Sequence, residues 1–346
     1  MIDKVDDRHI QRILPLISPA ALSVEWPATN EIRERVAQYR SEIEAILDGN
    51  DNRLIVIVGP CSVHDPAAAV DYAKQLKARA GHLGDKLLLV MRVYFEKPRT
   101  VMGWKGLIND PGLDESYDIN HGLALARKLL LDIAEIGLPA GTEFLDTTFG
   151  QFYADLISWG AIGARTAESQ IHRELASGLS MPVGIKNRTD GDVQVAVDAI
   201  RAAAHRHLFP TLTKEGTPAI YETSGNEYAH LILRGGDRSG SNYDAASIGE
   251  TLKLLAAHDL PWRLIVDCSH GNSGKNPNKQ IEVVESICQQ RKQGTTAIKG
   301  VMLESHLKSG RQNYSKEAEY GKSITDACLS LDQTLPLLEQ LHAAVD

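Results

Sequence analysis

Eight short apolar runs, each followed by a stretch with helical spacing, constrain the fold of this chain more than any other feature. The runs occupy residues 53–59, 87–95, 139–145, 161–165, 182–187, 230–236, 263–271 and 297–305. Strands that alternate with helices predict a parallel sheet, and eight such units in 346 residues suit an α/β fold of the (β/α)8 TIM-barrel type. A doubly wound open sheet would show the same alternation, so it stays open as the alternative.

Two segments lie outside this repeating pattern. Residues 1–50 precede the first predicted strand and contain a helical pattern from residue 30 to residue 49. Residues 207–223 read as two short strands around "KEGT", which predicts an inserted β-hairpin. We therefore expect an N-terminal extension over residues 1–50 and a barrel over residues 51–346.

Composition excludes several classes of protein. The net charge of −8 argues against nucleic acid as a main partner. No apolar run approaches the roughly 20 residues of a membrane helix, so we expect no membrane association. The N-terminus "MIDKVDDRHIQR" is polar and lacks the pattern of a signal peptide. The four cysteines show no CxxC spacing, and reduced thiols in a cytoplasmic protein are the expected state.

Basic residues gather where the predicted strands end. The carboxyl ends of barrel strands and the loops after them form the active face of this architecture. Each basic residue alone could be solvated surface, but several convergent cations are costly to desolvate without an anion. The expected ligand is therefore rich in phosphate and carboxylate groups. The residues concerned are Arg92, Lys97, Arg99, Arg165, Lys186 and Arg234.

A second set of residues at strand ends offers ligands for a metal ion. Sulfur, nitrogen and oxygen donors together suit a first-row divalent metal, although their spacing follows no zinc-finger pattern. Each member also has an ordinary interpretation. Cys61 could be a buried apolar thiol, His270 a structural histidine, Glu304 a surface acid and Asp326 a helix N-cap. The set is Cys61, His270, Glu304 and Asp326.

Cys61 could instead be a nucleophile. That role needs an activating base, and His64 is the base nearest in sequence. However, "HDP" at residues 64–66 is typical of a helix start, with an N-cap followed by proline.

Six motifs carry a resemblance to a known family. They are "GPCSVHD", "RVYFEKPRTVMGWKGLINDP", "WGAIGARTAESQIHRELASGLSMPVGIKN", "LILRGG", "DCSHGNS" and "YGKSITDAC". On these residues the chain resembles the class I 3-deoxy-D-arabino-heptulosonate-7-phosphate (DAHP) synthases, from about residue 5 to the C-terminus. Enzymes of this family catalyse the first step of the shikimate pathway to the aromatic amino acids.

The resemblance implies a transferase that condenses phosphoenolpyruvate (PEP) with erythrose 4-phosphate and depends on a divalent metal, Mn, Fe, Co or Zn. It implies metal ligation by Cys61, His270, Glu304 and Asp326. It implies a PEP site made of Arg92, Lys97, Glu143, Gly163, Ala164, Arg165, Lys186 and Arg234. It implies a tetrose-phosphate site at Lys97, Pro98, Arg99 and Thr100. Lys97, or a metal-bound water near Asp326, is the implied proton donor.

The resemblance also implies feedback inhibition by an aromatic amino acid in a homodimer or homotetramer. The implied inhibitor pocket involves Gly150, Gln151, Ser180, the hairpin and a neighbouring subunit's Asp6 and Asp7. Gly150 stands where the Phe- and Tyr-sensitive relatives carry proline, which favours Trp as the inhibitor. The stretches "SGLSMPVG" and "DCSHGNS" look more like the Tyr-sensitive type, so Tyr and Phe remain alternatives.

Two other functions remain to be distinguished. A related synthase would join PEP to arabinose 5-phosphate, but such relatives are shorter and differ after the second strand. A non-catalytic sensor of an aromatic amino acid would lack a metal ligand or a PEP arginine, and none is missing here.

Overall fold

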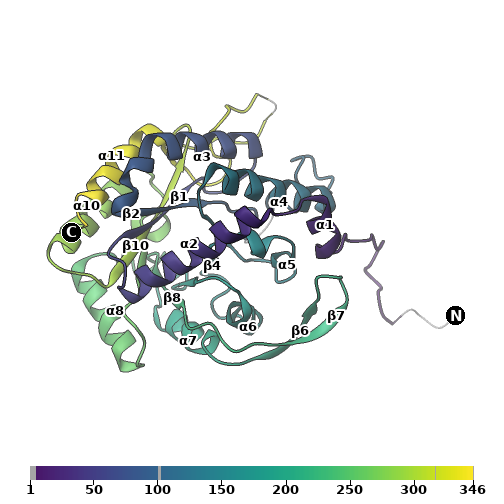
Figure 1. Ribbon diagram of the computed structural model, residues 1–346, viewed down its shortest axis with the longest axis horizontal. Coiled ribbons are helices and arrows are strands. Elements are labelled where there is room, and N and C mark those ends of the chain that lie inside the picture. Colours follow the sequence, from purple (N-terminus) through teal and green to yellow (C-terminus); the bar gives the residue numbers. More distant parts are fainter. Residues whose placement is uncertain (1–4, 100–102, 316, 346) are drawn as a thin grey trace.

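The computed structural model describes residues 5–99, 103–315 and 317–345. Eight parallel strands form a closed barrel, because the first strand pairs with both the second and the last. The barrel is therefore confirmed and the open sheet is excluded (Figure 1). The barrel strands are β1 (Leu54–Gly59), β2 (Leu87–Arg92), β3 (Ala140–Glu143), β4 (Trp159–Ile162), β5 (Val183–Lys186), β8 (Ala229–Leu233), β9 (Leu264–Asp267) and β10 (Ile298–His306).

Helices surround this barrel, as Figure 1 shows. The larger ones are α3 (Pro66–Ala80), α4 (Ile119–Ile136), α6 (Gln170–Gly178), α7 (Gln194–Ala203), α8 (Ala245–Ala257), α10 (Lys279–Lys292) and α11 (Leu331–His342). Short elements complete the chain: α5 (Gly150–Tyr153), α9 (His270–Ser273), β11 (Leu329–Ser330) and the 3-10 turns η1 (Gly81–Asp85) and η2 (Ala154–Leu156). The fourth strand starts earlier than predicted and ends at Ile162, so Arg165 lies in the following turn.

In β1 and β2, alternate residues along the strand belong to two different hydrophobic clusters. In β1, Leu54, Val56 and Val58 pack in the large cluster with the surrounding helices. Ile55 and Ile57 pack in the smaller cluster inside the barrel. Successive side chains of a strand point to opposite faces, so odd positions of β1 face the barrel axis.

The N-terminal extension folds into two helices and an arm. Helix α1 (Pro19–Glu25) is followed by α2 (Asn30–Asp48), which lies across the barrel in Figure 1. Ile43 and Ile46 of α2 are fully buried in the cluster that fills the barrel interior. Pro15 and Ile17 exchange hydrogen bonds with Asn120 of α4, and the described chain before them extends away from the body of the molecule in Figure 1.

The predicted hairpin is confirmed as β6 (Leu208–Leu212) and β7 (Pro218–Glu222), inserted between α7 and β8. Its turn reaches the N-terminal extension, because the Ala20 amide donates to the Lys214 carbonyl at 2.7 Å. The Lys214 ammonium donates to the carbonyl of Gln151 in α5 at 2.6 Å. The hairpin thus joins the extension to α5.

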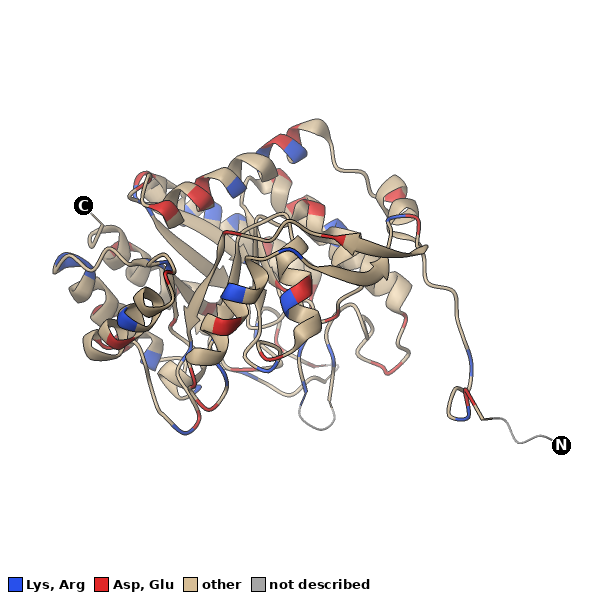
Figure 2. Ribbon diagram, turned by 90° about the horizontal axis from the view of Figure 1, so that it is seen from below, with Lys and Arg blue, Asp and Glu red and all other residues tan. Residues whose placement is uncertain are grey.

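The surface carries charges of both signs, spread over the helices and loops (Figure 2). Within the described part of the chain, no helix combines the length and apolar character that crossing a bilayer requires.

Candidate functional site

The site is built from side chains that continue the inward-facing columns of the barrel strands. In β2 the inward set runs through Leu88 and Val90, and the next inward position is Arg92. In β10 it runs through Met302, and the next is Glu304. The apolar layers below therefore become a charged layer at the carboxyl ends of the strands, where a barrel places its active face.

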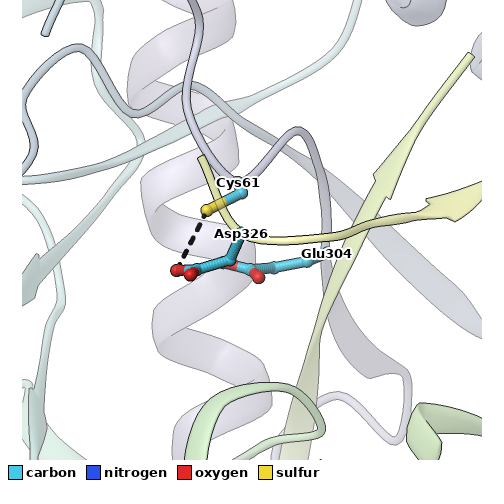
Figure 3. Close-up of side chains that lie close together, drawn as sticks. All are labelled: Cys61, Glu304 and Asp326. Carbon is cyan, nitrogen blue, oxygen red and sulfur yellow. Dashed lines mark hydrogen bonds between the residues drawn. The ribbon is translucent and has the colours of Figure 1, made fainter. Parts of the chain in front are cut away.

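Three predicted metal ligands lie together in this layer. The ligand atoms of Cys61, Glu304 and Asp326 all lie within 4.8 Å of one another. Figure 3 shows both carboxylates and the thiol directed toward one place from three separate segments. The Cys61 thiol is 3.6 Å from Asp326 Oδ2. Soft sulfur and hard oxygen donors at this separation suit a first-row transition metal.

His270, the fourth predicted ligand, stands at the edge of this cluster. Its Nε2 lies 3.7 Å from Glu304 Oε1. Its Nδ1 lies 2.8 Å from Oδ2 of the fully buried Asp267. A carboxylate on one ring nitrogen is the usual way in which a metal-binding histidine is oriented through the other. The residue also has a left-handed backbone with φ of 49°, which is uncommon outside glycine and recurs at functional sites.

The structure contradicts the ordinary interpretations of the two predicted acidic ligands, Glu304 as a surface acid and Asp326 as a helix N-cap. Glu304 is fully buried, so it is no surface acid. The N-cap of α11 is Ser330, so Asp326 caps no helix there. Asp65 is the N-cap of α3, as "HDP" predicts.

Among the described residues, the thiol of Cys61 makes its hydrogen-bond contacts with Lys97 and Asp326.

Opposite charges hold this cluster together. Burial and the nearby Glu304 raise the pKa of the Cys61 thiol to about 11, while Lys97, 2.9 Å from the sulfur, acts in the opposite direction. Burial opposes the charge on Lys97, but Cys61, Glu304 and Asp326 outweigh it and raise the pKa of the ammonium. Burial also opposes ionisation of Asp326, yet Lys97 and His270 keep the pKa of its carboxyl below the usual value. An ammonium thus sits among three potential anions.

A cavity of about 390 Å³ opens beside the cluster. Most of the predicted anion-binding residues line this cavity. Their positions in the sequence are spread over more than 200 residues. The predicted residues in its wall are Arg92, Lys97, Pro98, Arg99, Glu143, Ala164, Arg165, Lys186, Arg234, His270 and Asp326. The structure therefore brings these predicted residues together around one shared cavity.

The cations of the cavity differ in their exposure and in the hydrogen bonds and ion pairs that they already make. Arg165 is exposed, and no hydrogen bond of its side chain is found among the described residues. Arg234 is 5% exposed and donates to the Gly235 carbonyl at 3.2 Å. Lys186 is buried, 3.3 Å from Asp267 and 4.0 Å from Glu143. Arg165 is therefore available to a ligand without breaking an existing pair.

Two further predicted positions need separate comment. Gly163 lies in the turn after β4, where a Cβ would come within 2.3 Å of Glu143 Oε1. Only glycine leaves room there for the carboxylate. Thr100 lies outside the described residues, whereas Arg99 is exposed and donates from Nε to the Trp104 carbonyl at 2.8 Å.

Sequence reasoning missed several residues of this site. Asp267 is two positions after the inward-facing Ile265, and Tyr94 is two positions after Arg92. The period of two along a strand would have found both. Lys275 and Glu96 also line the cavity, and burial raises the pKa of the Glu96 carboxyl to about 8. Glu96 follows Tyr94 at the same spacing of two, whereas the loop position of Lys275 follows no such period.

The predicted inhibitor-site residues lie apart from this cavity. Gly150 and Gln151 are in α5, next to the hairpin turn, and Ser180 is exposed in the segment between α6 and β5. Asp6 and Asp7 are exposed in the N-terminal arm, which points away from the body (Figure 1). A Cβ at Gly150 would lie 3.1 Å from the Phe144 ring, so this ring already occupies the position next to the glycine.

The fold and the site define a class: an α/β-barrel protein with a cationic cavity beside a cluster of Cys, His and carboxylate groups, which are residue types that bind metals. Comparison with known proteins then gives the family. The sequence model of the DAHP synthetase I family matches residues 29–339, and the chain belongs to this family. The expectations of a DAHP synthase and of a TIM barrel are confirmed at this level.

Named relatives cover the whole chain. It is 53% identical to the Trp-sensitive phospho-2-dehydro-3-deoxyheptonate aldolase of Escherichia coli K12, over 100% of this chain and 99% of the relative. It is 54% identical to the Phe-sensitive enzyme of the same organism, over 98% and 97%. The structure of the corresponding aldolase from Francisella tularensis SCHU S4 superposes with a TM-score of 0.95 at 50% identity, over 97% of this chain and 98% of that one.

Proposed function

We propose that this protein condenses PEP with erythrose 4-phosphate to give DAHP and inorganic phosphate, the first step of aromatic amino acid biosynthesis. The observation that carries the proposal is a single cavity in which a cluster of metal ligands adjoins seven lysine and arginine side chains. The two substrates together bring two phosphates and one carboxylate, so the cations match the charge of the ligands.

A divalent metal fits the donor set of Cys61, His270, Glu304 and Asp326. When bound, such an ion polarises a carbonyl oxygen, which makes the aldehyde carbon of the tetrose more electrophilic. Manganese, iron, cobalt and zinc all accept these donors. Asp267 orients His270, so that Nε2 rather than Nδ1 faces the cluster.

The PEP site is assigned to cations of the cavity, Arg92 and Lys97 among them, with Arg165, Lys186 and Arg234 around the phosphate and carboxylate. The carbon C3 of PEP attacks the aldehyde, water adds at C2, and phosphate leaves by C–O cleavage. Positive charge develops at C2 during this sequence, and Glu143, 4.0 Å from Lys186, supplies a nearby negative charge. The main chain at Gly163 and Ala164 approaches the phosphate.

The tetrose phosphate is assigned to Lys97, Pro98, Arg99 and Thr100. Arg99 is exposed at the outer part of the wall, and Lys97 lies inside, 3.8 Å from Asp326. An aldehyde bound between them would face the metal cluster, while its phosphate would remain near the mouth. Lys97 is positioned to give a proton to the new alkoxide, and a water near Asp326 is the alternative donor.

Feedback inhibition is assigned to α5, Ser180 and the hairpin, completed by the arm of a second copy of the chain in a homodimer or homotetramer. Val5 and Ile13 of the arm are 90% and 84% exposed, which is unfavourable unless a partner covers them. Trp is the proposed inhibitor, on the basis of Gly150. The similar identities to the Trp-sensitive and the Phe-sensitive relatives leave Phe and Tyr as alternatives.

Turnover with two sugar phosphates tests the proposal. We expect DAHP from PEP and erythrose 4-phosphate after chelation and metal add-back, and little product from arabinose 5-phosphate. A preference for arabinose 5-phosphate would favour the related synthase instead. Binding of an aromatic amino acid without any turnover would favour the non-catalytic sensor.

A further inference from the structure

Arg92 is fixed by the protein before any ligand arrives. Its side chain is 1% exposed, and its Nε donates to the Pro60 carbonyl at 3.0 Å. Nη2 donates to the Cys61 carbonyl at 3.2 Å and to Glu304 Oε1 at 3.0 Å. Nη1 contacts Met302 Sδ at 2.9 Å. A guanidinium has five N–H groups, so only one, on Nη1, remains for a ligand.

The flat face of Arg92 is covered by Tyr94. The carbon Cζ of Arg92 lies 3.5 Å from the centre of the Tyr94 ring. The ammonium of Lys186 lies 5.9 Å from the same centre. Tyr94 is 2% exposed and lines the cavity. One aromatic ring therefore contacts two of the cations that face the cavity.

The hydroxyl group of Tyr94 is less engaged than its ring. Its contact is with Met302 Sδ at 4.0 Å, the long limit of a hydrogen bond to sulfur. By contrast, the two cations lie within the 6 Å at which a ring face attracts positive charge. The ring is thus the part of this side chain that acts on the cavity.

The face of the Tyr94 ring stabilises two neighbouring cations without adding negative charge to the cavity. Arg92 is already paired with Glu304 and Lys186 with Asp267, and a further carboxylate placed between the two cations would repel an anionic ligand. An aromatic face attracts both cations and carries no net charge. The cavity therefore stays positive for its ligand.

We propose that Tyr94 is a positioning residue for anion binding, and that its ring face holds Arg92 and Lys186 in the geometry that PEP requires. The proposal rests on the assignment of this cavity as the PEP site. It predicts that loss of the ring weakens PEP binding and that loss of the hydroxyl does not.

Calorimetric titration of the Mn²⁺-loaded enzyme with PEP tests this directly, together with the Michaelis constants for both substrates. Tyr94→Leu and Tyr94→Met should weaken PEP binding about 5- to 30-fold, the range of a desolvated cation–π contact. Tyr94→Phe should stay within about twofold of the wild type. The Michaelis constant for erythrose 4-phosphate should change little in all three variants.

Tyr72→Leu is the matched control. Tyr72 is also fully buried, but its ring contacts the His306 ring, and no cation lies over it among the residues that the structure describes. Tyr72→Leu should lower the unfolding temperature without weakening PEP binding. Equal PEP affinity in Tyr94→Leu and the wild type would overturn the proposal, as would equal losses in Tyr94→Phe and Tyr94→Leu. If Tyr94→Leu does not fold, Tyr94→Met decides, since its unbranched, flexible side chain adapts better to the space left by the ring. A wild type that binds PEP but forms no DAHP would refute the proposed function alone.

Discussion

At the scale of single residues, the inward-facing residues of one barrel strand include both apolar core residues and polar residues of the site. In β9, Ile265 packs in the barrel interior, and Asp267, two residues later, lies between His270 and Lys186. Burial opposes the charge on Asp267, but His270 and Lys186 outweigh it and keep the pKa of its carboxyl far below the usual value. A change at such a position affects two functions at once, metal binding and anion binding.

Cys61→Ser should lower the affinity for a divalent transition metal by at least tenfold. The hydroxyl is a harder and weaker ligand than a thiolate, and the two carboxylates cannot replace it. Metal titration with the apoprotein measures this without reference to activity. Cys288→Ser is the control, because this buried thiol lies in α10 outside the cluster. Normal metal affinity of the Cys61 variant would remove this residue from the ligand set.

Arg165→Ala and Arg234→Ala should each raise the Michaelis constant for PEP more than that for erythrose 4-phosphate. A charge-assisted hydrogen bond contributes about 1.5–3 kcal/mol, which corresponds to roughly 10- to 150-fold. Arg99→Ala should show the reverse selectivity. Initial rates with each substrate varied in turn provide the measurement, and equal effects on both substrates would show that the two sites are wrongly divided.

Some residues of the site could be predicted from the sequence and others could not, for physical reasons. Cys61, Lys186 and Arg234 stand at strand ends, where the barrel pattern alone indicates a site. The period of two along β9 places Asp267 on the inward face, but its role depends on a contact with Lys186, 81 positions earlier. Such a contact follows from barrel closure and cannot be read from local pattern.

At the scale of elements, a buried pair of rings links β4 to the start of β8 inside the barrel. Nε1 of Trp159 donates to Nε2 of His230 at 3.1 Å, which requires a neutral imidazole. Burial lowers the pKa of His230 to about 4. The strand pattern predicted both strands but not this bond, because only the closed barrel brings the two side chains together.

The burial of His230 makes the stability depend on pH. The unfolded imidazole has a pKa near 6.5, so between pH 6.5 and 4 the unfolded state takes up a proton that the native state refuses. Stability is therefore retained above pH 6.5 and falls on acidification, by up to about 1.4 kcal/mol per pH unit. His230→Gln should reduce this slope while keeping an acceptor for Trp159. Urea unfolding at pH 7.5 and pH 5 measures it.

His82→Gln is the control for that experiment, because His82 is exposed. It should leave the pH dependence unchanged. A slope for His230→Gln as steep as that of the wild type would show that this histidine is not held neutral in the native state. Some slope should remain in the variant, since burial also lowers the pKa of His306 to about 3.

At the scale of the whole molecule, the N-terminal extension has two separate parts. Helix α2 closes the barrel interior with Ile43 and Ile46, so its removal should destabilise the fold. The arm before α1 instead points away from the body (Figure 1). Deletion of residues 1–12 should therefore leave catalysis largely intact.

The same deletion should abolish inhibition by aromatic amino acids, if the arm completes the inhibitor pocket of a neighbouring copy. Inhibition requires that the ligand bind the low-affinity state better, by roughly 1–3 kcal/mol. Initial rates with Trp, Tyr and Phe titrated into full-length and truncated enzyme provide the test. Equal inhibition of both forms would contradict the proposed pocket across subunits.

The measurement closest to the central claim is the turnover of metal-free enzyme before and after a divalent metal is returned. The arrangement of Cys61, Glu304 and Asp326 beside the cationic cavity predicts no DAHP from PEP and erythrose 4-phosphate after chelation. It predicts restored synthesis with a divalent transition metal such as Mn²⁺. Full turnover by the metal-free enzyme would contradict the account, because the cluster would then have no part in the reaction.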